Sequence, residues 1–325
     1  MHLASTLARA LLTALMAGGM TAAAAQQYPV KPIRIVAPFG PGGLVDVLAR
    51  ALGEKMRASL GQPVIVDNRP GSGGNIGADI VAKAEPDGYT LLMSSAGILS
   101  INEALYSKMP FNPQTAFVPV TLVAEMNMLA VVNSGSPIKT AGDLIAAARK
   151  EPGKLNFGSP GNGTTGHLGM ELFQHAAKVK LTHVPYKSAA EAVIALMGNQ
   201  IQGVFDNPPM VLPHIRAGRL RALAYAAPKR LPLLPEVPTF DESALKGFEA
   251  SSWFGMVAPA RTPRPIVAVL AKEVGRAVRE PDVEKRFADL GAILVGNTPE
   301  QFGTFIRAET RKWHAVVKAA DIRLQ

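Results

Sequence analysis

Short apolar runs alternate along the chain with longer segments whose apolar residues recur at helical spacing. The run at 33–37 has the length of a buried strand, whereas 44–60 repeats its apolar positions every three or four residues, as one face of a helix requires. This alternation predicts an α/β protein with helices on both faces of its sheets. Further strands are predicted at 64–66, 90–94, 129–132, 155–158, 204–205, 222–226 and 253–258, and further helices at 76–83, 141–150, 167–177, 189–197, 210–217, 265–279, 283–290 and 299–317.

A strand that runs into a glycine-rich turn and then into a helix occurs in both halves of the chain, at 33–60 and again at 155–177. Two such units suit two lobes that face each other across a cleft. The segment from 265 onward is nearly all helical, so it needs a sheet to cover, and we expect it to return to the first lobe. The segment 228–240 holds four prolines and is expected to be an extended loop on the second lobe.

These patterns predict how the chain is divided between the two lobes. The chain is expected to cross from one lobe to the other twice, near 123–128 and near 248–254. The expected division is lobe one at 26–125 and 251–325, and lobe two at 126–250.

The turn after the first strand is the first candidate ligand site. A helix N-terminus presents backbone N–H groups without intrahelical partners and a partial positive charge, so it attracts small anions. The glycines would let a ligand approach closely, although a tight turn alone can also require them. Asp46 lies in the first helical turn, where stabilisation of the positive helix end explains its charge better than a ligand contact does. The candidates are Phe39, Gly40, Pro41, Gly42, Gly43 and Asp46.

Two further strand ends supply polar candidates. In an open α/β sheet, ligands bind outside the carboxyl ends of the strands. The serine hydroxyls after the strand at 90–94 could bond a carboxylate. Asp206 could accept a hydrogen bond from a ligand ammonium group, or it could fix Lys187 or a backbone turn, and the sequence leaves both open. The candidates are Ser94, Ser95, Ala96, Gly97 and Asp206.

The second glycine-rich turn adds two hydroxyl groups to its backbone donors. Its candidates are Gly163, Thr164, Thr165 and His167. His167 could act as a base or a metal ligand, but no second histidine or acid lies near it at metal-ligand spacing. We therefore interpret His167 as a capping or packing residue at a helix start.

Catalytic and cofactor motifs are incomplete in this chain. A dinucleotide motif beginning at Gly71 would need glycine at position 76, where Ile76 stands, and no acid ends the next strand. A hydrolase of a small ester or amide could use Ser95 and His167. However, Ser95 lacks the G-x-S-x-G context, and an unaided serine is a poor nucleophile. We expect a protein that is not an enzyme and that uses no cofactor and no metal.

Composition adds the expected location. Residues 1–25 combine one charge, an apolar run and small residues for cleavage, which predicts a secretory signal peptide removed before Gln26. The chain has no cysteine, so it forms no disulfide and carries no lipid-modified N-terminal cysteine. The net charge of +9 is scattered without an aromatic–basic stripe, which argues against nucleic-acid binding and allows weak attraction of anions. A diffusible, monomeric periplasmic protein fits these features.

Several strings in order along the mature chain resemble one known family. They read PGGLVDVLAR at 41–50, GQPVIVDNRPGSGGNIGAD at 61–79, PDGYTLL at 86–92, SPGNGTTGHL at 159–168, VPYK at 184–187 and VFDN at 204–207. The chain is identified as a member of the Bug family, the periplasmic substrate-binding proteins of tripartite tricarboxylate transporters. One departure is Ser188, where the family commonly has glycine after Tyr-Lys.

The resemblance implies a two-lobed periplasmic-binding-protein fold of the second topological type. It also implies capture of a small organic carboxylate between the lobes and delivery to a membrane permease. Some relatives serve as ligand sensors, and the sequence does not separate the two uses. Positions 39–46, 94–97, 163–167 and 206 match the family's ligand-binding pattern, in which a carboxylate is held partly through waters.

Overall fold

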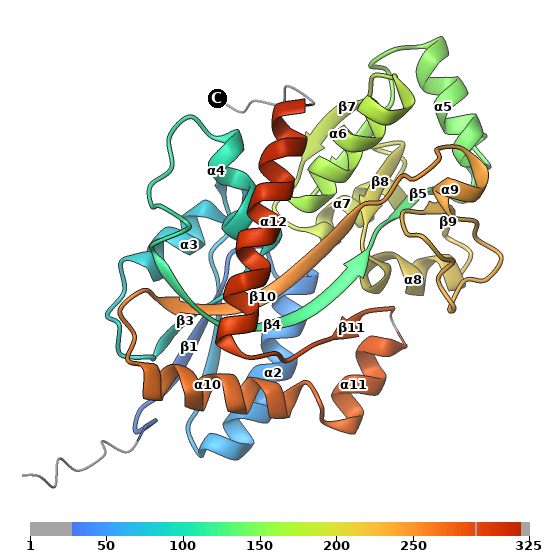
Figure 1. The fold of residues 1–325 in the computed structure, drawn as a ribbon. Helices are drawn as coiled ribbons and strands as arrows, with labels where there is room; N and C mark the ends of the chain where they lie inside the picture. Colours follow the sequence, from blue (N-terminus) through green and yellow to red (C-terminus); the bar gives the residue numbers. More distant parts are fainter. Residues whose placement is uncertain (1–27, 290, 320–325) are drawn as a thin grey trace, which may run out of the picture.

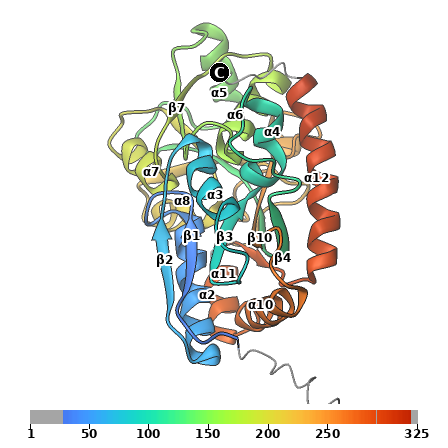
Figure 2. The ribbon, with the colours of Figure 1, turned by 90° about the vertical axis from the view of Figure 1, so that its left-hand side faces the viewer.

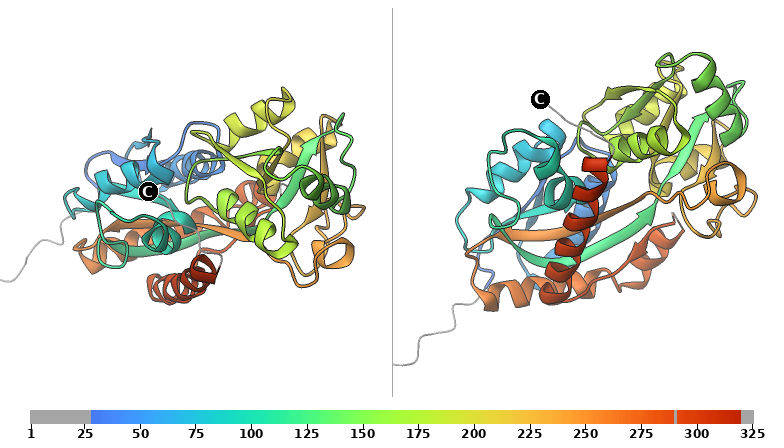
Figure 3. Two further views of the ribbon diagram at one scale, coloured as in Figure 1. Left: turned by 90° about the horizontal axis from the view of Figure 1, so that it is seen from above. Right: turned by 45° about the horizontal axis from the view of Figure 1, so that its top comes forward.

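Two β-sheets, each covered by helices, lie side by side and are joined by long strands (Figures 1 and 3). The computed structural model describes residues 28–289 and 291–319, so the predicted signal peptide at 1–25 lies outside the described residues. In this described part, no helix is both long and apolar enough to cross a bilayer.

The sheet of lobe one begins with three parallel strands. β1 (Ile33–Ala37) lies between β2 (Val64–Asn68) and β3 (Thr90–Ser95), so the carboxyl ends of all three strands meet at the edge that faces lobe two. The sheet order is β11-β4-β10-β3-β1-β2. Its other elements are α2 (Leu44–Leu60), η1 (Ser72–Gly74), α3 (Asn75–Ala82), η2 (Gly97–Ile101), α4 (Asn102–Leu105), β4 (Phe117–Asn127), β10 (Ser251–Pro259), α10 (Arg264–Ala277), α11 (Pro281–Ala288), β11 (Ile293–Leu294) and α12 (Pro299–Ala319).

The sheet of lobe two repeats this plan, with the order β7-β6-β8-β5-β9. In both sheets three parallel strands stand in the order second, first, third, and an antiparallel strand follows them. That antiparallel strand is β10 in lobe one and β5 in lobe two. The elements are β5 (Leu129–Asn133), α5 (Ala141–Lys150), β6 (Asn156–Ser159), α6 (Thr165–Ala177), β7 (Thr182–Pro185), α7 (Ala189–Met197), β8 (Gly203–Asp206), α8 (Pro208–Arg216), β9 (Leu220–Tyr225) and α9 (Phe240–Ser243).

The chain crosses between the sheets where β4 continues into β5 and where the segment before β10 returns. Met128 joins these two crossings, because its N–H donates to Ala250 O at 3.0 Å and its carbonyl accepts from the Ala226 N–H at 2.8 Å. The expected crossovers at 123–128 and 248–254 contain Met128 and Ala250. The expected lobe boundaries at 125/126 and 250/251 stay a prediction.

The C-terminal helices cover the sheet of lobe one, as predicted. α12 packs along β4 and η2, and α10 packs against β4 and α2 (Figures 1 and 2). Trp253 of β10 and Trp313 of α12 are both buried, and both indole N–H groups donate to Glu309 of α12. The predicted α/β architecture with two crossovers and a returning C-terminal segment is confirmed.

Three strands, β4, β7 and β11, were not predicted from the sequence, for physical reasons. β4 was expected only as a linker, because it is buried on both faces and so shows no alternation, and because Pro119 interrupts it. Pro119 lies next to a register shift between β4 and β10, at which β4 has an extra residue, Val120; a proline without an N–H is tolerated at such a bulge. β7 is a short, mostly polar edge strand that ends in Pro185, and β11 has only two residues.

Candidate ligand-binding site

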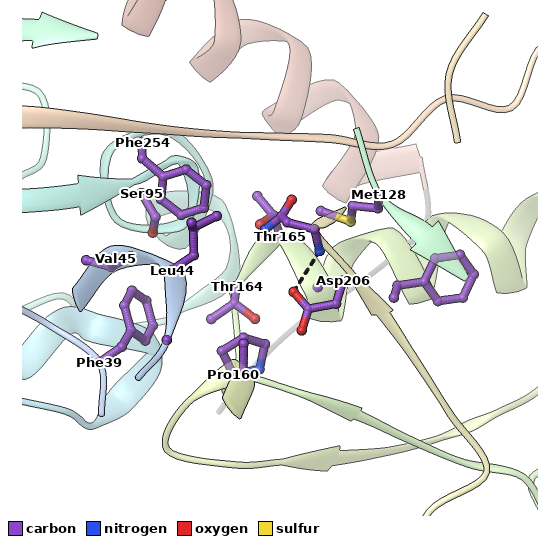
Figure 4. Close-up of a pocket in the computed structure, with 15 residues that line it drawn as sticks. Phe39, Leu44, Val45, Ser95, Met128, Pro160, Thr164, Thr165, Asp206 and Phe254 are labelled. Carbon is purple, nitrogen blue, oxygen red and sulfur yellow. Dashed lines mark hydrogen bonds between the residues drawn. The ribbon is translucent and has the colours of Figure 1, made fainter. Parts of the chain in front are cut away.

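A cavity lies between the lobes, where the carboxyl ends of strands from both sheets face each other. It contains about 490 Å³ of empty space, part of it open to solvent. Figure 4 shows side chains of lobe one on one side and of lobe two on the other. The lining residues are Phe39, Gly43, Leu44, Val45, Ser95, Met128, Pro160, Thr164, Thr165, Gly166, Ala189, Phe205, Asp206, Asn207 and Phe254.

The N-terminus of α2 forms part of the lobe-one wall. Gly43 is its N-cap and supplies no side-chain cap, and the first intrahelical bond runs from the Val47 N–H to Gly43 O at 3.0 Å. The N–H groups of Leu44 and Val45 precede that bond and lie at the cavity. Gly42 has φ 79°, a left-handed conformation that favours glycine.

Asp46 holds this turn together and does not line the cavity. Its carboxylate accepts from the Gly42 N–H at 3.0 Å and from the Asn68 amide at 3.0 Å, and it pairs with Arg50 at 2.9 Å. Burial opposes ionisation, but these hydrogen bonds outweigh it and lower the pKa of the carboxyl. The structure therefore agrees with the interpretation of Asp46 as a structural charge.

The N-terminus of α6 faces α2 from lobe two. Thr164 is its N-cap: its hydroxyl accepts from the His167 N–H at 3.4 Å and donates to Gly161 O at 2.7 Å. The first intrahelical bond runs from the Leu168 N–H to Thr164 O. The backbone N–H groups of Thr165 and Gly166 precede it, and both residues line the cavity.

His167 lies behind this turn and is not among the lining residues. Its Nδ1 accepts from the Gly163 N–H at 3.2 Å, and its Nε2 lies 3.5 Å from Glu171. Its ring stacks on His183 with centroids 4.0 Å apart, and burial lowers the pKa of His183 to about 3. The expectation that no acid or second histidine lies near His167 is therefore wrong, because Glu171 is one helical turn away and His183 is stacked on the ring. The contacts with the Gly163 N–H and with His183 agree with a packing and capping role for His167.

Ser95 lies at the end of β3, and its hydroxyl is buried without a hydrogen-bond partner among the described residues. A serine nucleophile needs a base in hydrogen-bond contact. The described residues supply none to Ser95, so the geometry does not support the hydrolase alternative. The hydroxyl remains available to donate to a ligand in the cavity that it lines.

Asp206 ends β8 and faces the cavity from lobe two (Figure 4). Its Oδ1 accepts from the Asn207 N–H at 2.7 Å, and no cation pairs with it among the described residues. Full burial raises the pKa of this carboxyl to about 7, although the backbone hydrogen bond opposes the rise. The alternative in which Asp206 fixes Lys187 is therefore not observed. The side chain helps to hold its own turn and leaves Oδ2 facing the cavity.

Six of the predicted site residues line the cavity: Phe39, Gly43, Ser95, Thr164, Thr165 and Asp206. The other predicted residues lie next to the lining or behind it: Gly40, Pro41, Gly42, Asp46, Ser94, Ala96, Gly97, Gly163 and His167. Leu44, Val45 and Gly166 also line the cavity; they lie within the ranges 39–46 and 163–167 that the resemblance indicated but were not named as candidates. Sequence reasoning missed Met128, Pro160, Ala189, Phe205, Asn207 and Phe254. Leu44 and Val45 directly follow the first turn, Pro160 and Gly166 belong to the second, and Phe205 and Asn207 flank Asp206, so their positions in the sequence are the signal that could have found them.

The rims of the two lobes also touch each other directly. The Gly40 N–H donates to Lys187 O at 3.0 Å, and the Tyr106 hydroxyl donates to Asn162 O at 3.1 Å. A Cβ added at Gly73 would collide with the same Asn162 carbonyl. We call these the rim contacts. They bring the two lobes into direct contact on one side of the cavity.

No cluster of metal-ligating side chains is found within residues 28–289 and 291–319.

The sequence pattern of the tripartite tricarboxylate transporter family receptor matches residues 48–322. Protein BugT of Bordetella pertussis is 38% identical over 310 residues, which are 95% of each chain. The structure of the periplasmic binding protein BugD superposes with a TM-score of 0.87 at 35% identity and covers 91% of this chain and 100% of BugD. The structure of R. palustris Rpa4515 with adipate superposes with a TM-score of 0.88 at 36% identity and covers 91% of this chain and 100% of that one.

Proposed function

Because the chain belongs to the family of tripartite tricarboxylate transporter receptors, we propose that it captures a small organic carboxylate between its lobes and delivers it to a membrane permease of that transporter type. At the coarser level the chain is a periplasmic solute-binding protein of this family, with the two-lobed fold of its solved relatives. The structure of R. palustris Rpa4515 contains adipate, which is a carboxylate, and this supports a carboxylate as the ligand of the present chain.

The observation that carries the proposal is the pair of helix N-termini at one cavity. α2 belongs to lobe one and α6 to lobe two, and both direct early backbone N–H groups to the same space. Backbone donors and the positive end of a helix favour an anion without placing a formal charge in the site. A carboxylate bound there would bridge the lobes.

Bridging explains how binding could be coupled to closure. We propose that the lobes rotate about the crossings at Met128 and Ala250, with boundaries at 125/126 and 250/251. Each N-terminus alone would bind weakly, and closure brings the two together. The rim contacts support this view, since they hold the two lobes against each other beside the cavity.

The proposed site of action is the periplasm, reached through the signal peptide at 1–25, and the proposed working form is a monomer. The periplasmic relative supports the location.

A thermal-shift screen of carboxylates against the signal-free protein tests the binding function. A cognate ligand at ~100 times its Kd should add about 2.7 kcal/mol to the free energy of unfolding, which is plain in the melting temperature. Phosphates and neutral amides of the same size serve as controls. A protein that no carboxylate stabilises would contradict the proposal.

Delivery to a permease needs its own test. Uptake of the radiolabelled ligand should fall when the gene is deleted and recover with the wild-type gene but not with a variant that cannot bind. Uptake that is unchanged by deletion, together with altered gene expression in response to the ligand, would replace transport by sensing.

A further inference from the structure

The two walls of the cavity differ in chemistry. The lobe-one wall is apolar, and its lining residues include Phe39, Leu44, Val45 and Phe254 (Figure 4). Ser95 is the only polar side chain that the described residues add to that wall. Polar side chains come from lobe two. A ligand in this cavity therefore meets hydrocarbon over much of its surface.

Charge is distributed just as unevenly. Of the cavity-lining residues in the described part of the chain, none is lysine, arginine or histidine. Asp206 is the one charged residue among them, and it has no cationic partner there. Every group that could bind an anion must therefore be a neutral donor.

The neutral donors are concentrated in one place. The N-termini of α2 and α6 lie at the cavity, and the N-terminus of α7 is adjacent, since a Cβ added at Gly43 would lie 3.9 Å from the Ala189 N. α8 offers no comparable donors. Its first two residues, Pro208 and Pro209, have no N–H, and the Asn207 N–H is already bonded to Asp206. The backbone donors are therefore confined to one part of the cavity, and outside it the lining consists of Asp206, the Asn207 amide, the Ser95 hydroxyl and the apolar wall.

From this juxtaposition we infer that the ligand carries a single carboxylate on an apolar body, with a hydrogen-bond donor such as a hydroxyl directed at Asp206. The inference rests on the proposed function and narrows it. The carboxylate binds at the α2 and α6 N-termini, the body packs on Phe39, Leu44 and Phe254, and the donor meets Asp206 Oδ2. A second carboxylate at that end would meet hydrocarbon and would be repelled by Asp206 in its ionised form, so the two carboxyl groups could not both be charged there without a cost in free energy.

Two matched series test the inference. The aliphatic series is hexanoate, 6-hydroxyhexanoate and adipate, and the aromatic series is benzoate, 4-hydroxybenzoate and terephthalate. Within each series only the end opposite the first carboxylate changes. In calorimetry on the signal-free wild-type protein, the hydroxy acid of each series should bind with the highest affinity. The dicarboxylate of the same series should bind at least roughly tenfold more weakly than the hydroxy acid. A broader screen of mono-, di- and tricarboxylates covers ligands of other shapes.

The variant Asp206→Asn tests whether Asp206 is the cause. It removes the charge and nearly preserves the shape, so the preference for hydroxy acid over dicarboxylate should shrink by at least roughly tenfold. A merely structural role would weaken all ligands equally and leave that ratio unchanged. Asp241→Asn, at a surface acid of lobe two that pairs with Lys246, is the matched control and should leave the ratio as in wild type.

The outcomes separate the two levels of the argument. If dicarboxylates or tricarboxylates are the tightest binders in the screen, or if Asp206→Asn leaves the ratio unchanged, the single-carboxylate inference is overturned while carboxylate binding stands. If no carboxylate of any class binds, the proposed function fails and the inference fails with it.

Discussion

The most demanding prediction concerns the stability of the ligand-free protein rather than its binding. Asp206→Asn should make the protein more stable above neutral pH. Asp206 is fully buried and has no cationic partner among the described residues, so its ionised form is poorly stabilised in the native state. The amide has no charge to bury.

The magnitude follows from the pKa. Burial raises the pKa of Asp206 from 3.8 to about 7, and a difference of this size corresponds to at most roughly 4 kcal/mol of unfolding free energy. Between these two values the unfolded chain has released a proton that the native protein still holds. The wild type therefore loses stability as pH rises from about 4 to about 7 and reaches its full penalty above that range. The variant lacks this loss.

The contribution of His183 to the pH dependence of stability has the opposite sign and must be separated from that of Asp206. Its pKa falls to about 3 on burial, so the native protein loses stability as pH falls below about 6.5. This contribution is present in both proteins. The difference between wild type and variant at each pH cancels it and isolates Asp206.

Urea unfolding of both proteins, after refolding to remove any carried ligand, measures that difference between about pH 4 and about pH 8. The variant should gain at least roughly 1.4 kcal/mol relative to wild type between the two ends of this range, the equivalent of a tenfold change in the ionisation constant. A stability difference that stays constant across the range would refute the reasoning, because Asp206 would then not titrate with a raised pKa.

Three further predictions concern the site and its closure. Gly43→Val should abolish ligand binding measured by calorimetry, because the branched side chain fills the space before α2; Gly43→Ala is the control, since its Cβ would lie 3.5 Å or more from its neighbours. Normal binding by the valine variant would contradict the backbone-donor site. Thr165→Val should weaken binding by about 1.5–3 kcal/mol if its hydroxyl bonds the carboxylate, and His167→Ala, behind the turn, should weaken it less; the reverse order would count against this assignment. Tyr106→Phe removes one rim contact and should lower affinity by roughly two- to tenfold, with a larger ligand-free radius of gyration in small-angle scattering, and an unchanged radius and affinity would exclude a role in closure.

The fold was largely predictable because its signals are local. Apolar runs, glycine-rich turns and helix caps lie within a few residues of one another, so the units at β1–α2 and β6–α6 could be recognised from their own sequence. β4 could not, because burial on both faces removes alternation and Pro119 argues against a central strand. Its place depends on β10, more than a hundred residues away.

The cavity was predictable only in part, for the same reason. Phe39, Gly43 and Thr165 belong to turns whose chemistry is visible in sequence. Phe254 and Met128 belong to the two crossings between the lobes. The sequence indicated a hinge at these crossings but did not indicate that they line the cavity. The contact between Tyr106 and Asn162 depends on how the lobes close, and no local pattern encodes it.

The measurement that tests the central claim most directly is a calorimetric comparison of the tightest carboxylate ligand with its methyl ester. Esterification removes the charge and keeps the rest of the ligand. If the carboxylate binds at the N-terminal N–H groups of α2 and α6, the ester should bind at least roughly tenfold more weakly, as the loss of a charge-assisted hydrogen bond requires. Equal affinity for acid and ester would contradict the account.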